Sequence, residues 1–138
     1  MIFRRDAKMK LLAGVPLFQA CSQPELARVA GIATQLDEPE GKVLIREGAP
    51  GRDFFVLAEG TAEVRKGSRR VATLGPGDFA GEIALLTNAP RTATVKTTSP
   101  VTVLRVTAKG FGELLDTSPT IQRKIRKALA DRIAPGAL

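Results

Sequence analysis

Two charged side chains near the middle of the chain stand where an anionic sugar ligand could use them. Glu82 follows a glycine and opens a short apolar run, and Arg91 follows Pro90 just before a β-favouring run. A carboxylate accepts hydrogen bonds from hydroxyl groups, whereas the planar fork of an arginine guanidinium grips phosphate oxygens in pairs. The pair therefore suits a phosphate ester of a sugar.

The neighbouring residues can add backbone donors to this pair. Gly81 has no Cβ, so the main chain there can approach a ligand closely. The run 82–86 is long enough for one or two helical turns, whose N-terminal amides favour an anion. Thr92 offers one more hydroxyl or amide donor. The candidate ligand-binding residues of this segment are Gly81, Glu82, Ile83, Ala84, Arg91, Thr92 and Ala93.

Each of these residues also has an ordinary structural explanation. Turn glycines occur in any small β protein, and a glutamate at a helix start is favourable through the helix dipole alone. Most arginines are solvated on the surface. The interpretation as a binding site therefore depends on the order and spacing of the residues together.

The elements that would position the segment are short strands separated by glycines. The β-favouring runs are Val43–Ile45, Phe54–Leu57, Ala62–Val64, Val71–Leu74, Thr94–Val95 and Val101–Val106. Lys66-Gly67-Ser68 is typical of a hairpin tip. Many short strands at this spacing predict an antiparallel sandwich, barrel or jelly roll, and with the helices at the two ends the coarse picture is a small β-roll. The fold class is mainly β with flanking helices (α+β), including an N-terminal helix, a short phosphate-binding helix and two C-terminal helices.

Helical patterns lie at the two ends of the chain. Ser22 and Glu25 match a capping box before Leu26, Val29, Ala30 and Ala33 at helical spacing. Ser118-Pro119 is typical of a helix start, and apolar residues follow it every fourth position: Ile121, Ile125, Leu129 and Ile133. A shorter helix carries Phe111, Leu114 and Leu115. We expect residues 1–138 to form one domain, with the roll at about 34–107 and C-terminal helices at about 108–133.

Composition excludes several classes of function. The chain has no His and only one Cys, Cys21, which removes disulfides, histidine catalysis, Ser–His triads and most metal sites. Without histidine it is not a cupin-type metalloenzyme, and no catalytic constellation is visible, so we expect no enzyme. The lone Cys21 is interpreted as a small apolar residue in a reducing cytoplasm. No apolar run reaches the roughly 20 residues that span a bilayer.

The segment closely resembles the phosphate-binding cassette of the cyclic-nucleotide-binding domain family. The matching residues are Gly81-Glu82-Ile83-Ala84-Leu85 and, after a short gap, Pro90-Arg91-Thr92-Ala93. The likeness extends to Gly41–Gly48 and Phe54–Gly60, which are similar to the family's early strands, and covers about residues 15 to 133. One departure is Ala80, where the family often has a bulky residue.

The resemblance implies a role for each matching residue. Glu82 would bind the ribose 2′-hydroxyl and Arg91 the cyclic phosphate, while Gly81, Ala84 and Thr92 would supply further donors. Val64 and Val71 would line the apolar side of the pocket. The last helix would fold over the base as a lid, and Arg132 corresponds to an arginine that stacks on the purine in some bacterial channel members.

The implied function is a regulatory sensor that binds cyclic AMP, or less favourably cyclic GMP, without a cofactor. An alternative is a degenerate member that serves as a protein-interaction module or a nucleic-acid-associated regulator, since the net charge of +7 favours anionic partners. No helix-turn-helix segment follows the last helix, so specific DNA binding is not expected. The effector partner is unknown. The basic N-terminal cluster and the last helix are candidate surfaces for docking or homodimer formation.

Overall fold

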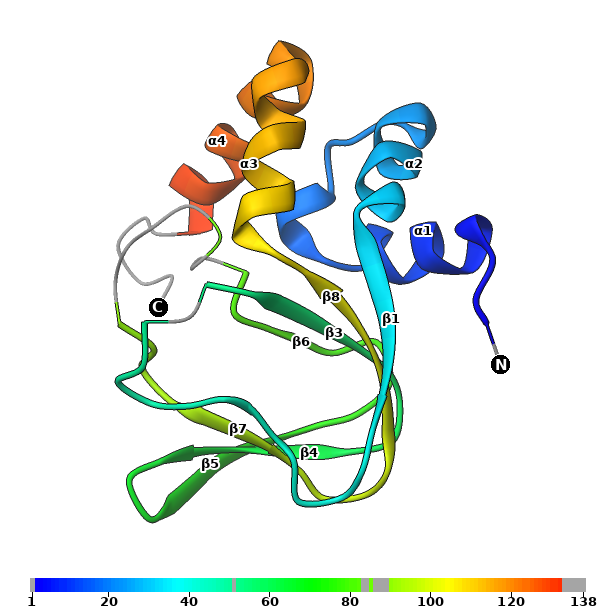
Figure 1. Cartoon of the computed structure of the whole chain (residues 1–138). Coiled ribbons are helices and arrows are strands. Elements are labelled where there is room, and N and C mark those ends of the chain that lie inside the picture. The colour runs from blue at the N-terminus through cyan, green and yellow to red at the C-terminus, as the bar shows by residue number, and fades with distance from the viewer. Residues whose placement is uncertain (1, 51, 83–84, 86–89, 133–138) are drawn as a thin grey trace. The chain divides into compact units, whose positions relative to one another are not determined.

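Residues 34–108 pair into two four-stranded sheets, with strand orders β1-β8-β3-β6 and β2-β7-β4-β5 (Figure 1). The computed structural model describes residues 2–50, 52–82, 85 and 90–132. The strands are β1 (Ala33–Glu38), β2 (Val43–Ile45), β3 (Phe54–Glu59), β4 (Ala62–Lys66), β5 (Arg69–Leu74), β6 (Phe79–Ala80), β7 (Thr94–Thr97) and β8 (Val101–Val106). Antiparallel pairing joins β3 to β6 and β8, and β7 to β2 and β4. The predicted β-roll is confirmed.

The core of this unit lies between the two sheets, because both contribute inward-facing apolar side chains. The buried cluster consists of Ile45, Phe55, Leu57, Ala62, Val95, Val101 and Val103. Phe55 and Leu57 of β3, and Val101 and Val103 of β8, alternate along their strands and so share the face that meets the other sheet. The two central strands of the first sheet, β3 and β8, are the most completely buried.

Four elements were missing from the sequence prediction, among them a 3-10 turn over Pro16–Phe18, and several boundaries differ, such as that of β5, which begins at Arg69 and not at Val71. Strand β1 has the polar sequence ATQLDE and pairs beside β8, and β6 is only two residues long. A helix also forms over residues 5–13, within the basic opening segment. Ala33, expected on the helix after Ser22, instead begins β1, because that helix ends at Gly31.

The second compact unit combines residues 1–33 with residues 109–138. Its elements are α1 (Arg5–Ala13), the 3-10 turn η1 (Pro16–Phe18), α2 (Gln23–Gly31), α3 (Ala108–Thr117) and α4 (Pro119–Arg132). Its core includes an edge-to-face pair of Phe18 and Phe111, with ring centroids 5.9 Å apart. Ile121 and Ile125 of α4 are fully buried, Leu129 is half-buried, and Ile133 lies outside the described residues. The interpretation of residues 1–138 as one domain stays a prediction.

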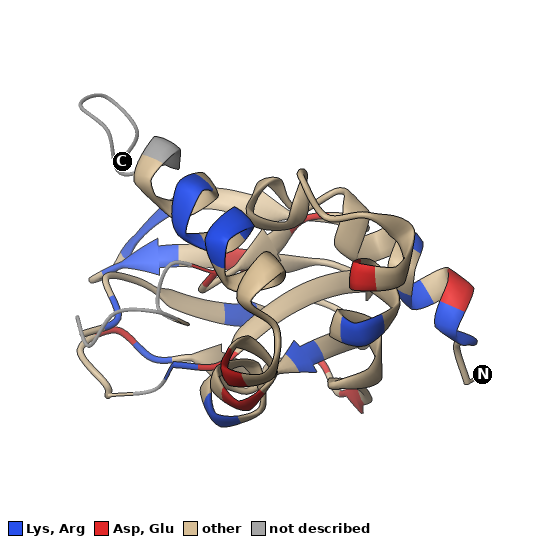
Figure 2. Cartoon of the chain, turned by 90° about the horizontal axis from the view of Figure 1, so that it is seen from above, with Lys and Arg blue, Asp and Glu red and all other residues tan. Residues whose placement is uncertain are grey.

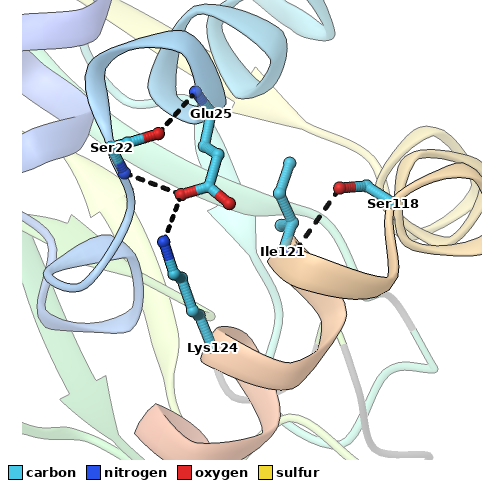
Figure 3. A network of polar contacts seen from close by, with 5 residues as sticks. All are labelled: Ser22, Glu25, Ser118, Ile121 and Lys124. Carbon is cyan, nitrogen blue, oxygen red and sulfur yellow. Dashed lines mark hydrogen bonds and ion pairs between the residues drawn. The ribbon is translucent and has the colours of Figure 1, made fainter.

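The predicted capping box at Ser22 forms and extends to the last helix (Figure 3). The Ser22 N–H donates to Glu25 Oε1 at 2.7 Å, and Lys124 Nζ of α4 donates to the same oxygen at 2.6 Å. The hydrogen bond from Lys124, followed by that from the Ser22 backbone, holds the pKa of Glu25 below its ordinary value. Burial, and then the Glu25 charge, raises the pKa of the nearby Cys21 thiol. The thiol is therefore protonated at neutral pH, as expected for a small packing residue.

Helix α4 is strongly basic on its solvent side. Blue positions gather on the last helix before the C-terminal end in Figure 2, and Arg123, Arg126 and Lys127 are exposed. In the part of the chain that the structure describes, no helix combines the length and apolar character needed to cross a bilayer.

Candidate functional site

The segment that follows β6 leaves the sheet at Gly81, and its far end returns at Arg91. Strand β6 is fixed to β3 through the pairs Phe55–Ala80 and Val56–Phe79. At the other end, Arg91 shares two backbone hydrogen bonds with the loop after β2: Gly48 N–H donates to its carbonyl at 2.8 Å, and its own N–H donates to Ala49. Both ends of the segment are therefore anchored to the roll.

Gly81 lies directly against the Arg91 side chain. Its φ of +87° is in the left-handed region that only glycine adopts without strain. A Cβ built at this position would lie 2.7 Å from Arg91 Nη1, 2.8 Å from the Asp53 carbonyl oxygen and 3.2 Å from the Ile45 Cδ1. The structure thus brings together two of the predicted site residues that are ten positions apart in sequence.

Arg91 is a buried cation, with only 8% of its surface exposed. Its Nη2 donates a hydrogen bond to the main-chain carbonyl of Asp53. Burial lowers the pKa of Arg91, and the negative charge of Asp53 opposes that shift. Because a guanidinium keeps its proton even so, this side chain is a fixed positive charge held away from bulk water. Such a charge binds an anion more strongly than an exposed one does.

Glu82 is also buried, at 7% exposed. The Leu85 N–H donates to the Glu82 carbonyl at 3.2 Å, which closes a single turn, and the Leu85 side chain is buried. Ile83 and Ala84 lie outside the described residues, so the expected short helix is described only at this turn. A buried carboxylate and a buried guanidinium in one short segment are the two groups that the sequence singled out.

An apolar space lies next to this polar end of the roll. Its walls come from both sheets, and one lining residue, Ala80, immediately precedes Gly81. The lining residues are Leu44, Phe55, Leu57, Ala62, Leu74, Asp78, Phe79, Ala80, Val95 and Val103. This space belongs to the core between the two sheets, and Ala80 is its link in sequence to Gly81, which does not itself line it.

The remaining predicted site residues are placed less directly. Thr92 is exposed, and Ala93 is half-buried just before β7. Val64 packs against the apolar cluster, opposite Val95 on β7, whereas Val71 is 40% exposed on β5. Arg132 is the last residue of α4, and its side chain lies outside what the structure describes.

Sequence reasoning missed Asp53, which contacts Arg91, and Ile45, whose side chain lies next to Gly81. Asp53 contacts Arg91 through its main-chain carbonyl, which no side-chain pattern reveals. Asp53 lies just before β3, opposite the segment after β6, and β6 was not predicted, so the sequence held no signal for this contact. No cluster of three or more metal-ligating side chains occurs among the described residues.

Comparison with known proteins finds the same family in the family models and among curated relatives. Residues 38–118 match the family model described as "Cyclic nucleotide-binding domain". The chain is 43% identical to a cAMP-dependent protein kinase regulatory subunit of Mycosarcoma maydis over 96 residues, covering 67% of this chain and 18% of that protein. The curated relatives that it matches include cyclic nucleotide-gated potassium channels, and the chain spans 18% to 35% of their lengths.

Two solved structures share the fold. One is the N-terminal domain of a transcriptional regulator from Streptomyces coelicolor A3(2), with a TM-score of 0.82, 26% identity and coverage of 89% of this chain and 91% of that chain. The other is a cAMP-bound PfPKA-R, with a TM-score of 0.70, 30% identity and coverage of 92% of this chain and 46% of that one.

Proposed function

The chain belongs to the cyclic nucleotide-binding domain family, and on that premise we propose that it is a cyclic AMP sensor that regulates a partner without catalysing a reaction. The observation that carries the proposal is the buried Arg91 guanidinium against Gly81, in the same short segment as the buried Glu82. In the proposed complex Arg91 binds the cyclic phosphate and Glu82 the ribose 2′-hydroxyl. Gly81, Ala84 and Thr92 donate around the phosphate, and the base lies on the apolar side with Val64 and Val71.

Calorimetric titration of the purified chain with cyclic AMP and cyclic GMP tests this function. We expect saturable binding of both nucleotides, with cyclic AMP the tighter, since both a 43% identical relative and a solved neighbour are named for cyclic AMP. Chromatography of the nucleotide after the titration should recover it unchanged. Absence of binding by either nucleotide would overturn the proposal, and turnover would overturn its non-enzymatic part.

Replacement of Glu82 with glutamine should remove discrimination at the ribose. The wild type is expected to bind cyclic AMP about tenfold more tightly than 2′-deoxy cyclic AMP, because a buried carboxylate accepts a strong hydrogen bond from the 2′-hydroxyl. The Glu82→Gln variant should bind both ligands with similar, weaker affinity. Calorimetry with both ligands on both proteins gives the coupling free energy between the Glu82 carboxylate and the 2′-hydroxyl directly. If the Glu82→Gln variant prefers cyclic AMP over 2′-deoxy cyclic AMP as strongly as the wild type does, another residue binds the ribose hydroxyl.

We also propose that α4 carries the signal, with Arg132 stacking on the base. In its own unit α4 is held by the buried Ile121 and Ile125 and by the Lys124–Glu25 ion pair, whereas Leu129 further along is only half-buried. The distal half is therefore the part with apolar surface available for a ligand.

Hydrogen exchange provides the check on this signal. With nucleotide at about 100 times its Kd, amide exchange in residues 126–132 should slow by up to about 100-fold, as linkage allows for a ligand that binds only the docked form. Residues 23–31 of α2 serve as the internal control and should change little. Equal protection of α4 with and without nucleotide would contradict the lid role.

We propose in addition that the protein is cytoplasmic and that it regulates an effector protein. Cys21 is a free thiol, which suits a reducing cytoplasm, and the regulated effector and a homodimeric state are proposals for the assembled protein. Fractionation of cells and affinity capture with and without cyclic AMP would test them.

A further inference from the structure

Charge is unevenly distributed within residues 34–108. These residues carry ten Lys and Arg against nine Asp and Glu. Four of the cations, however, lie within the thirteen residues of the β4–β5 hairpin, where Glu63 is the only acid. The hairpin is therefore strongly positive, and the rest of the unit is net negative. The ligand site does not explain this segregation.

One arginine of the hairpin fixes its shape. Arg65 Nε donates to Glu63 Oε1 at 2.6 Å, and its Nη1 donates to the Ser68 carbonyl at 2.8 Å across the turn. The hydrogen bond from Arg65, and then the charges of Arg65, Arg70 and Lys96, hold the pKa of Glu63 below its ordinary value. The outer face of this sheet therefore already binds one carboxylate, that of Glu63, among cations. Arg65 holds it through the planar guanidinium group that suits carboxylates.

The other three cations of the hairpin are directed to solvent. Lys66, Arg69 and Arg70 are exposed, and five of the six residues of β5 are exposed. Strand β5 is also the last strand in its sheet, as Figure 1 shows, so one side of its backbone pairs with β4 and the other faces outward in the described part of the chain.

Like charges on an edge strand disfavour pairing with a second copy of the same edge, because the cations would then face each other. An acidic strand meets the opposite situation, since its carboxylates neutralise the same residues. The edge is therefore selective by charge. The register shift in the pairing of β5 with β4 near Val64 limits the regular stretch of β5, so a short segment fits better than a long one.

We propose that β5 binds a short, extended, acidic segment of a partner protein as an added strand, with carboxylates on Lys66, Arg69 and Arg70. Main-chain hydrogen bonds along the edge supply affinity, and the cations supply specificity. An extended peptide satisfies both features. A phosphate polyanion or a lipid surface would use the cations alone and leave the strand edge unused. The cations of this surface are not among the residues assigned to the nucleotide, although Val71 lies on the same strand, and the surface gives the sensor a place to meet an effector.

Fluorescence anisotropy with labelled peptides of about eight residues tests the proposal, since this length matches one strand. The probe repeats two glutamates followed by two valines, because Arg69 and Arg70 are consecutive in β5 and face opposite sides of the sheet, so carboxylates are needed on both. A lysine–valine peptide of the same pattern controls for charge, and the acidic peptide N-methylated on alternate amides controls for strand pairing. We expect the acidic probe to bind, the lysine peptide not to bind, and N-methylation to weaken binding about tenfold.

Charge reversal on the protein locates the surface. The Arg69→Glu, Arg70→Glu double variant should weaken binding of the acidic probe by about tenfold or more, whereas Arg123→Glu, Arg126→Glu on α4 should change it by less than about twofold. If both double variants lose affinity for the acidic probe equally, the effect comes from the net charge of the protein, and β5 is not the binding surface. Failure of the acidic probe to bind, or binding of a DNA oligonucleotide or phosphatidylserine vesicles in its place, would overturn the proposal as well. Melting curves confirm that the variants are folded.

Discussion

Replacement of Arg91 with alanine is expected to weaken cyclic AMP binding by about 100-fold, or about 2.7 kcal/mol, the scale of a charged hydrogen-bonded contact. The guanidinium is 8% exposed, so its attraction for a phosphate is screened little by water. Calorimetry at one salt concentration measures the change. Arg46→Ala, which removes an exposed arginine from the nearby loop, is the matched control and should leave the affinity nearly unchanged.

The lysine variant separates charge from geometry at the same position. Arg91→Lys keeps a positive charge but loses the planar fork and the reach to the Asp53 carbonyl. Its affinity should fall between those of the wild type and Arg91→Ala. If the Arg91→Ala variant binds cyclic AMP as tightly as the wild type, other groups hold the phosphate. The assignment of Arg91 then fails, even though the chain binds the nucleotide.

The second large effect is expected for Gly81→Ala. The new Cβ would lie less than 3 Å from both Arg91 Nη1 and the Asp53 carbonyl oxygen, at a φ of +87°. The backbone conformation alone should destabilise the fold by about 1–2 kcal/mol, and the clash should displace the Arg91 side chain from its position. We therefore expect both a lower melting temperature and a nucleotide affinity reduced by about tenfold or more.

Gly77 offers a close control for this substitution. Its φ is +90°, yet a Cβ there would meet no atom within 4 Å. Gly77→Ala should show the same backbone strain in thermal melting but bind cyclic AMP like the wild type. Equal loss of binding in the two variants would mean that strain alone, and not contact with Arg91, is responsible.

The roll was predictable because its strands follow β-branched and aromatic runs between turn glycines. Val43–Ile45 and Val101–Val106 form strands at the predicted bounds. Strand β1 was not predictable from its own residues, since ATQLDE has little β preference and becomes a strand by pairing with β8. Tertiary pairing overrode local propensity at that position.

The candidate site shows the same division. Residue type and spacing selected Gly81, Glu82 and Arg91, and the structure brings Gly81 against Arg91 and buries both charged side chains. The contribution of Asp53 was invisible, because a main-chain carbonyl carries no residue signature. The roles of Val64, Val71 and Arg132 toward a ligand stay predictions.

The composition of the helical unit from both ends of the chain has a consequence for the order of assembly. Lys124 meets Glu25 across 99 positions, and Arg28 meets Thr117 across 89. During synthesis the contiguous residues 34–108 can form their sheets as soon as they emerge, while α1 and α2 lack the helices that complete their core. Closing such distant contacts is slow relative to local ones. The sheet unit is therefore expected to act as the early intermediate, and the helical unit, which contains α4, to complete folding last.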